Sequence, residues 1–252
     1  MRIEYLYRYP IKGLTAEALE STEVEPGACI PWDRAFALAQ GDAGFDPAKP
    51  EYRHPRLFMC GKISARISLL RSTFEDRSGD LAIRAPDGTG VVANARYPEG
   101  RAEIGAFLTA YLGAEARGVP EFHHVPGHSF SDQRAQVISL ISMDSLGDFE
   151  AKIGARRHRR RFRANLWFSG AAPWAEFDWI GREIQVGGVR MRVTQRIGRC
   201  AATEVNPENA ERDADPVAEL SQLYGHTDLG IYAEVIEGGR FAVGDAIQLM
   251  PE

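Results

Sequence analysis

The chain of 252 residues is long enough for one large domain or two smaller ones, with a core that needs no disulfides. Its formal net charge of −5 argues against a nucleic-acid-binding protein, and no apolar run approaches the ~18 residues of a membrane-spanning helix. The three cysteines, Cys29, Cys60 and Cys200, are too few and too widely spaced for a disulfide framework or a CxxC zinc site. Because the first residues also lack a secretory signal pattern, we expect a cytoplasmic protein with free thiols and no membrane partner.

The first hundred residues have the pattern of short strands separated by turns. Ile3, Tyr5, Tyr7 and Tyr9 alternate with more polar neighbours, which predicts a half-buried strand. Glycine, proline and aspartate separate the further predicted strands, at 17–25, 35–40, 64–70 and 80–85. Strands this short and this regularly spaced are typical of a β-barrel or sandwich.

A helix is predicted over 101–112, because its apolar residues recur with helical spacing up to Gly113. The segment 114–134 follows, rich in glycine, proline and histidine and without periodicity. Such a segment indicates a domain boundary or a long functional loop.

The second half is again rich in strands. An apolar strand over 137–141 precedes Ser142, which can cap a helix that ends at Gly154. Further along, we predict a strand at 165–169, a hairpin over 183–195 that turns at Gly187-Gly188, a helix from Pro216 to near Gly225 with Asp215 as its cap, and strands at 230–236 and 246–250. The pattern therefore predicts a mainly β protein of the β-barrel type with a few helices, in the α+β class.

Cys200 follows a predicted strand and has Arg196 and Arg199 just before it. Nearby positive charge favours the thiolate, which attacks electrophiles and binds soft metals. The alternative is that Cys200 packs as a small buried hydrophobic residue, and the residues alone leave both interpretations open. Cys29 and Cys60 lie among apolar residues and are interpreted as core.

The run 156–163 consists of basic residues apart from Phe162. It can be a solvated face, an RNA- or anion-binding surface, or a segment that turns one or two arginines inward to bind a small anionic cofactor. Lys12 and Arg34 fit the third interpretation, although each alone would be an ordinary surface charge. GxGxxG, GxxxxGK[ST], GxSxG and HExxH motifs are absent, which argues against dinucleotide, P-loop and zincin enzymes.

The motifs of the chain together resemble the MOSC superfamily, the molybdenum-cofactor sulfurase C-terminal domain, with its usual N-terminal β-barrel domain. The resemblance covers nearly the whole chain and rests on YPIKG and DR near the start, then RFRAN, PWAEFDW, GRCAATEVNP, GIYAEV and VGDAIQL in order. The Arg-Cys-x-x-Thr block followed by Asn-Pro is the most specific of these. This resemblance implies a MOSC N-terminal β-barrel domain over 1–115 and a MOSC domain over 116–252, with a molybdopterin-type cofactor between them.

The resemblance also implies the site residues. In the amidoxime-reducing components, the catalytic branch of the superfamily, the cysteine of this block is the protein ligand to molybdenum, which corresponds to Cys200. Lys12, Arg34, Arg163 and Asn165 correspond to contacts with the pterin or its phosphate. Arg199 and Thr203 belong to the cysteine block and would line the site. Two departures are Gly13, where the best-known reductases have serine, and Asn206, where the family usually has aspartate.

The function implied by the resemblance is that of a molybdenum-cofactor-dependent oxidoreductase. It would reduce small N-hydroxylated or otherwise N-oxygenated compounds to the amine-type product and water. Residues 208–252 contain no cysteine, so a ferredoxin-type segment is absent there and the electrons must come from a separate protein. The alternatives are a non-catalytic carrier of persulfide sulfur or of the cofactor, and, third, an anion- or RNA-binding module that uses residues 156–163.

Overall fold

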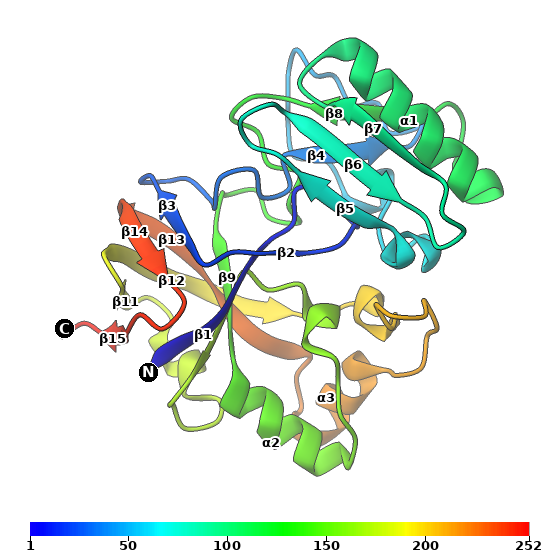
Figure 1. The fold of residues 1–252 in the computed structure, drawn as a ribbon. Helices are drawn as coiled ribbons and strands as arrows, with labels where there is room; N and C mark the ends of the chain where they lie inside the picture. The colour runs from blue at the N-terminus through cyan, green and yellow to red at the C-terminus, as the bar shows by residue number, and fades with distance from the viewer. Residues whose placement is uncertain (252) are drawn as a thin grey trace.

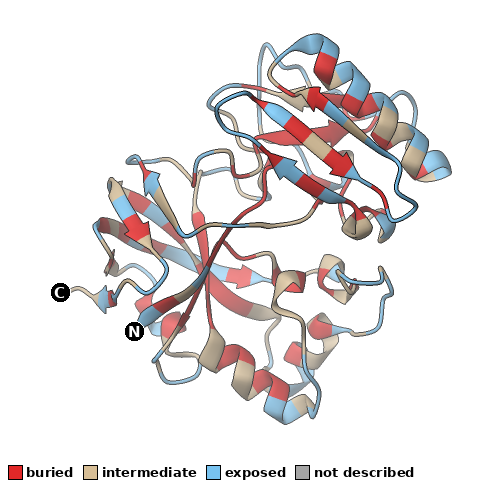
Figure 2. Cartoon of the chain, viewed as in Figure 1, coloured by how far each residue is buried: buried red, intermediate tan, exposed pale blue. Residues whose placement is uncertain are grey.

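Fifteen β-strands and three α-helices make up the ordered elements of residues 1–251, the part of the chain that the computed structural model describes. They form two lobes, a large lobe around an eight-stranded sheet with α2 and α3, and a small lobe with α1 and strands β4 to β8 (Figure 1). Buried residues follow the strands of both lobes and the inner faces of the helices (Figure 2). The predicted mainly β fold with a few helices is confirmed.

The sheet of the large lobe curls until its ends meet. In order across the sheet, its strands are β15 (Ile247–Leu249), β11 (Glu183–Val186), β12 (Val189–Gly198), β13 (Asp228–Glu237), β9 (Ile138–Ser142), β10 (Leu166–Ser169), β1 (Arg2–Arg8) and β2 (Glu17–Ala18). Arg2 bridges Ala246 just before β15, and the Ile247 N–H donates to the Met1 carbonyl at 2.9 Å. The sheet is therefore a barrel, and its interior holds a large hydrophobic core.

Alternation along the strands explains how this core forms. In β12, Val189, Met191 and Val193 are fully buried, while Arg192, between the last two, and Thr194, after Val193, are exposed. The predicted hairpin over 183–195 is confirmed as β11 and β12, joined at Gly187 and Gly188.

Helix α2 (Met143–Ile153) connects the parallel pair β9 and β10, as a parallel crossover requires. Ser142 caps it, since its hydroxyl accepts from the Asp144 and Ser145 amides, and Gly154 ends it in the left-handed conformation at φ 66°. Helix α3 (Pro216–Tyr224) likewise begins after Asp215 and ends at Gly225. Both predicted helices are confirmed.

The small lobe packs α1 (Pro98–Leu112) over short strands. These are β4 (Phe36–Ala39), β5 (Arg71–Phe74), β6 (Asp80–Arg84), β7 (Gly90–Asn94) and β8 (Glu121–His124). Ile104, Leu108 and Leu112 of α1 are buried in this lobe's core, as the predicted helical spacing requires. The strand predicted at 64–70 is wrong, because Arg66–Leu69 form a 3₁₀ helix there. The aperiodic segment 114–134 contains β8, which pairs with β4.

β1 carries the chain from the large lobe to the small one (Figure 1). Its register with β10 shifts between Ile3 and Tyr5, so the predicted strict alternation fails: Tyr5 is 37% exposed, whereas Leu6, Tyr7 and Tyr9 are buried. A second link between distant segments is the pair β3 (Ser21–Val24) and β14 (Gly239–Ala242).

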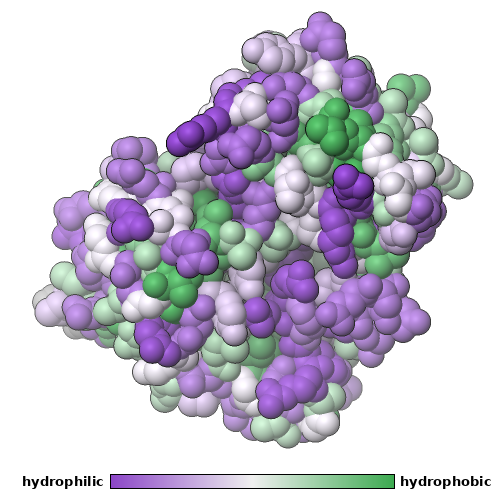
Figure 3. Space-filling model, in the orientation of Figure 1, coloured by the Kyte–Doolittle hydropathy of each residue, from purple (hydrophilic) through white to green (hydrophobic). Residues whose placement is uncertain are grey.

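The surface is mostly hydrophilic in the face seen in Figure 3, with hydrophobic residues in separated patches. Among residues 1–251, none of the helices combines the length and the apolar character needed to cross a bilayer.

Candidate functional site

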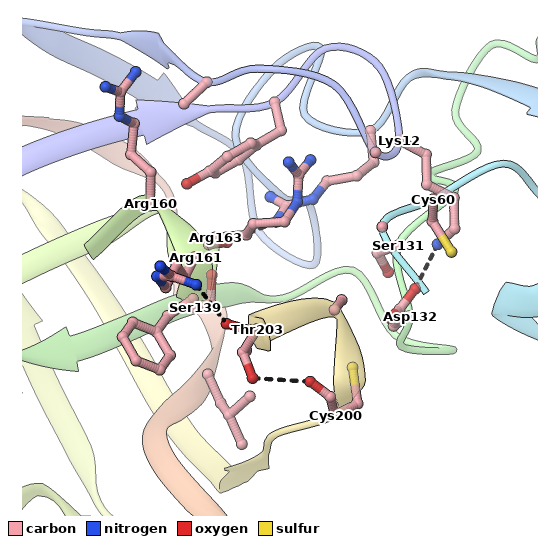
Figure 4. Close-up of a pocket in the computed structure, with 18 of the residues that line it drawn as sticks. Lys12, Cys60, Ser131, Asp132, Ser139, Arg160, Arg161, Arg163, Cys200 and Thr203 are labelled. Carbon is pink, nitrogen blue, oxygen red and sulfur yellow. Dashed lines mark hydrogen bonds and ion pairs between the residues drawn. The ribbon is translucent and has the colours of Figure 1, made fainter. Parts of the chain in front are cut away.

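A cavity of about 190 Å³ is lined by residues of both lobes. All seven residues predicted to form the site line it: Lys12, Arg34, Arg163, Asn165, Arg199, Cys200 and Thr203. They come from the turn after β1, the loop before β4, the segment before β10 and the end of β12. The structure thus brings together residues nearly 200 positions apart, while their roles remain predictions. Figure 4 shows Lys12, Arg163, Cys200 and Thr203 around this space.

Tyr9 is fully buried, and two guanidinium groups lie close to its ring. The guanidinium carbons of Arg34 and Arg163 lie 4.4 Å and 4.3 Å from its ring centre. Both arginines adopt positive φ, 53° and 51°, a strained backbone conformation that often marks functional sites. Arg34 Nη2 donates to the Arg163 carbonyl at 2.8 Å, which fixes the two segments relative to each other.

Arg34 and Arg163 differ in how their charge is compensated. Arg34 Nη1 forms an ion pair with the buried Asp33 at 2.5 Å; burial opposes its charge, but Asp33 and Tyr9 raise its pKa. Arg163 donates to the Leu14 carbonyl at 2.5 Å and forms no ion pair within residues 1–251. Burial and the neighbouring Arg34 lower the pKa of Arg163 to about 10. A bound anion would complement Arg163.

Lys12 is buried, with a side-chain exposure of 6%, so it is not the ordinary surface charge that its sequence context also allowed. Its ammonium donates to the Phe130 carbonyl at 2.8 Å and forms an ion pair with Asp132 (Figure 4). Burial opposes the charge of Asp132, but Lys12 and then Lys62 hold its pKa below the usual range. Asp132 is therefore a charged carboxylate at neutral pH.

Gly13, next to Lys12, has a physical reason to be glycine. Its φ is +88°, and an added Cβ would lie 3.0 Å from the Met59 carbonyl oxygen and 3.1 Å from the Cys60 Cα. A serine would strain the turn in this chain, so the departure from the best-known reductases follows from the local packing.

Cys200 lies at the end of β12 and is partly exposed. The short 3₁₀ helix Ala201–Glu204 follows it, and the Thr203 amide and hydroxyl both donate to the Cys200 carbonyl at 2.9 Å. Lys62 is the cation beside the thiol: burial opposes its charge, but Cys200 and Asp132 raise its pKa. The thiol is thus anchored through its own backbone and faces a positively charged cavity.

Arg199, before Cys200, is partly buried and, like Arg163, has no ion pair within residues 1–251. It donates to the carbonyls of Phe162 (2.9 Å) and Leu229, and its Nε is buried without a hydrogen-bond partner. Burial lowers its pKa to about 10, although Tyr232 and Cys200 partly offset that effect. An unpaired buried guanidinium is costly unless a ligand complements it.

Asn165 also lines the cavity, but its amide is engaged within the protein. Its Oδ1 accepts from the Ser139 amide (3.2 Å) and hydroxyl (2.7 Å), and its Nδ2 donates to the Tyr7 carbonyl at 3.2 Å. Asn165 therefore ties β9 and β1 to the start of β10 beside the cavity.

The basic run is not a uniformly solvated face. Arg160, Arg161 and Arg163 line the cavity, and the buried Arg161 also forms an ion pair with Asp213. Arg157 points elsewhere and pairs with Glu219, while Arg156 is exposed. The arrangement corresponds to the third interpretation of the sequence, in which the inner end of the run faces a bound anion.

Three further residues of the cavity escaped the sequence analysis: Lys62, Asp132 and Tyr9. Nothing in the local sequence marks Lys62, Asp132 lies in the aperiodic segment 114–134, and Tyr9, which begins the YPIKG motif, was interpreted only as a strand residue. Cys60, interpreted as core, is indeed buried, but it also forms part of the cavity wall. Cys29 is partly buried outside the cavity, where burial raises its pKa to about 11.

The donor set suits one thiolate-ligated metal with an anionic cofactor. Within residues 1–251, no group of three or more His, Cys, Asp or Glu side chains could hold a metal ion. A metal at Cys200 would therefore take its remaining ligands from outside the protein. The surplus of buried positive charge beside Cys200 fits a negatively charged carrier of those ligands.

Two family models match the chain. The MOSC N-terminal beta barrel domain matches residues 1–115, and the MOSC domain matches residues 126–248. Together they leave few residues unmatched.

Curated relatives match shorter parts of the chain. The chain is 28% identical to mitochondrial amidoxime-reducing component 1 of Mus musculus over 134 residues, which are 48% of this chain and 38% of that protein. It is 34% identical to molybdenum cofactor sulfurase of Danio rerio over 74 residues, 29% of this chain and 9% of that protein. The chain thus matches well under two thirds of the length of these relatives. The solved YUAD protein from Bacillus subtilis is 16% identical, with a TM-score of 0.45, over 98% of this chain and 93% of that one.

Proposed function

This chain is a MOSC domain protein related to the amidoxime-reducing components, and from that premise we propose that its cavity binds a molybdenum cofactor. With that cofactor the protein would reduce N-hydroxylated or related N-oxygenated compounds. The observation that carries the proposal is the placement of Cys200. Its partly exposed thiol shares one cavity with Arg163 and Arg199, two partly buried arginines that have no carboxylate partner within residues 1–251.

The residues present fit such a cofactor. Cys200 would be the protein ligand to the metal, because a thiolate suits a soft redox metal. Arg163 and Arg199 would bind the negative charge of the cofactor, and the buried Arg199 Nε is a donor that still lacks an acceptor. Arg34 and Tyr9 would hold Arg163 in place by the stacked arrangement already described.

The bound cofactor would supply the two-electron chemistry, and the protein would supply binding, orientation and charge. The overall reaction balances as R–NH–OH + 2 e⁻ + 2 H⁺ → R–NH₂ + H₂O, with electrons from a separate donor protein. Lys12 Nζ lies on the cavity wall, in an ion pair with Asp132. Ser131 and Gln133, next to Asp132 in the chain, line the same space and offer polar contacts to a small substrate.

A second candidate is supported by the contact between Lys62 and Cys200. A lysine that stabilises the thiolate would also serve a carrier that holds persulfide sulfur on Cys200 without catalysing a reduction. This candidate needs the thiol and Lys62, but it needs no electron donor.

The experiment has two stages. Molybdenum and pterin are first measured in the purified full chain, and we expect close to one of each per chain. Turnover of benzamidoxime is then measured with an artificial reductant. Bound cofactor with turnover supports the reductase; bound cofactor or persulfide without turnover favours the carrier; absence of molybdenum, pterin and persulfide refutes both.

A further inference from the structure

A second cavity, of about 130 Å³, adjoins the first. The segment 127–136 forms one side of it, and Pro50, Tyr52 and Arg53 come from the loop before the Pro55–Leu57 turn. Ser131 and Gln133 line both cavities. A molecule bound in the main cavity could therefore extend past these two residues into the second one.

The charge of this second cavity is positive and uncompensated. Arg53 and Arg134 line it, no Asp or Glu does, and neither arginine forms an ion pair within residues 1–251. The Arg134 guanidinium lies 4.9 Å from the centre of the Tyr52 ring, which restrains its orientation. Burial lowers the pKa of His128, the third basic residue of this cavity, so its side chain is neutral at pH 7. His128 therefore contributes aromatic surface to the cavity and no positive charge.

The chemistry of the lining selects a class of ligand. Tyr52, Phe58, Phe130 and His128 provide aromatic surface, and the guanidinium fork of arginine matches a carboxylate with two hydrogen bonds. We propose that this cavity binds the carboxylate of an aromatic or planar acidic substrate whose N-oxygenated end lies in the main cavity. The proposal rests on the proposed reductase function, and it adds a preference for acidic substrates.

The test compares two amidoximes that differ only in charge. Benzamidoxime and its para-carboxylate are reduced by the wild type and by Arg53→Gln and Arg134→Gln, which remove charge but keep a polar side chain. We expect the wild type to prefer the carboxylate about tenfold in kcat/KM through a lower KM, and each variant to lose most of that preference. Turnover of neutral benzamidoxime should stay within about twofold. Arg56→Gln is the matched control, since Arg56 is an exposed arginine of the adjoining Pro55–Leu57 turn that does not line the cavity.

A binding measurement separates this inference from the proposed function. Binding of 4-carboxybenzamidine and of benzamidine, neither of which can be reduced further, is measured by calorimetry. The wild type should bind 4-carboxybenzamidine more tightly than benzamidine, and Arg53→Gln and Arg134→Gln should not. Added salt should weaken this preference of the wild type. Equal binding of the two compounds, or an equal effect of Arg56→Gln, overturns the inference. Loss of molybdenum in Arg53→Gln also overturns it, because the second cavity would then serve the cofactor. If benzamidoxime is not reduced but the carboxylate binds more tightly, the reductase fails and the anion site stands.

Discussion

The two walls of the main cavity differ in how the positive charges of their side chains are compensated. On the first wall, formed by residues before position 63, Lys12 and Arg34 are each matched to an aspartate, Asp132 and Asp33. On the second wall, formed by residues 160–203, Arg163 and Arg199 are held by backbone carbonyls and aromatic rings instead. The charges of Lys12 and Arg34 on the first wall are therefore balanced without a ligand. The second wall keeps an excess of positive charge that only a bound anion would complement.

The pKa values express the same contrast. Asp33 and Tyr9 raise the pKa of Arg34 against the effect of burial, whereas burial lowers the pKa of Arg163 and of Arg199 to about 10. Substitutions on the first wall should therefore affect folding, and substitutions on the second should affect ligand binding.

The largest effect should come from Cys200→Ser, at the end of the second wall. The fold should persist, because the Cys200 contacts to Thr203 use the backbone carbonyl. Bound molybdenum should fall at least tenfold, since loss of residues that merely support metal ligands already costs about 10- to 100-fold in affinity. Molybdenum per chain after gel filtration measures this, with Cys29→Ser as the control that keeps its metal. Unchanged metal content in Cys200→Ser would refute the ligand assignment.

Arg163→Ala should come next, with cofactor retention about ten- to a hundredfold lower. A charge-assisted hydrogen bond contributes about 1.5–3 kcal/mol, and each 1.4 kcal/mol is about tenfold in affinity. Arg157→Ala is the contrast, because Arg157 pairs with Glu219 away from the cavity and should lower the melting temperature while metal content stays unchanged. Equal losses of metal in both variants would mean that the basic run acts as one surface.

Of the three substitutions, Arg34→Ala should reduce cofactor binding least, and its main effect should be a lower free energy of unfolding. The sequence pattern alone predicts a small effect on apo stability, as for a surface charge, but the pair with Asp33 is buried. Removing one partner leaves Asp33 uncompensated, so we expect the free energy of unfolding to fall by about 3 kcal/mol. Urea unfolding of the apo protein measures this, and Asp33→Asn combined with Arg34→Gln should recover part of the loss. A fall of less than about 0.5 kcal/mol in the free energy of unfolding would show that the Arg34–Asp33 pair does not stabilise the first wall.

The large lobe is easier to predict from the sequence than the small lobe, because local residues mark its helix ends and its hairpin turn. The Ser142 cap, the Gly154 stop, the Gly187-Gly188 turn and the α3 boundaries are each determined by neighbours in sequence, and the structure has all of them. β5, β7 and β8 were not predicted, because these short strands depend on pairing with distant partners rather than on their own pattern.

The candidate site divides in the same way. The family resemblance pointed to the residues of its motifs, and the structure gathers them in one cavity. Lys62 and Asp132 were missed, because each reaches Cys200 or Lys12 through a loop whose path only the tertiary structure sets. The bulge in β1 was missed for a related reason: it depends on the register with β10, which lies far along the chain.

The position of β1 in the barrel has a consequence for synthesis. Among the described residues, β1 precedes every other strand, whereas its partner β10 ends only at Ser169 and its bridging residue Ala246 lies further along still. At translation rates of about 5–20 residues per second, the N-terminal strand waits for roughly 8–30 s before β10 has been made. During that interval β1 has only the two-residue strand β2 to pair with, so the side chains of Leu6 and Tyr7, buried in the folded protein, stay exposed on the nascent chain. A circular permutant that starts after β3 and places residues 1–24 behind β15 would remove the delay, and it should fold faster after release from the ribosome.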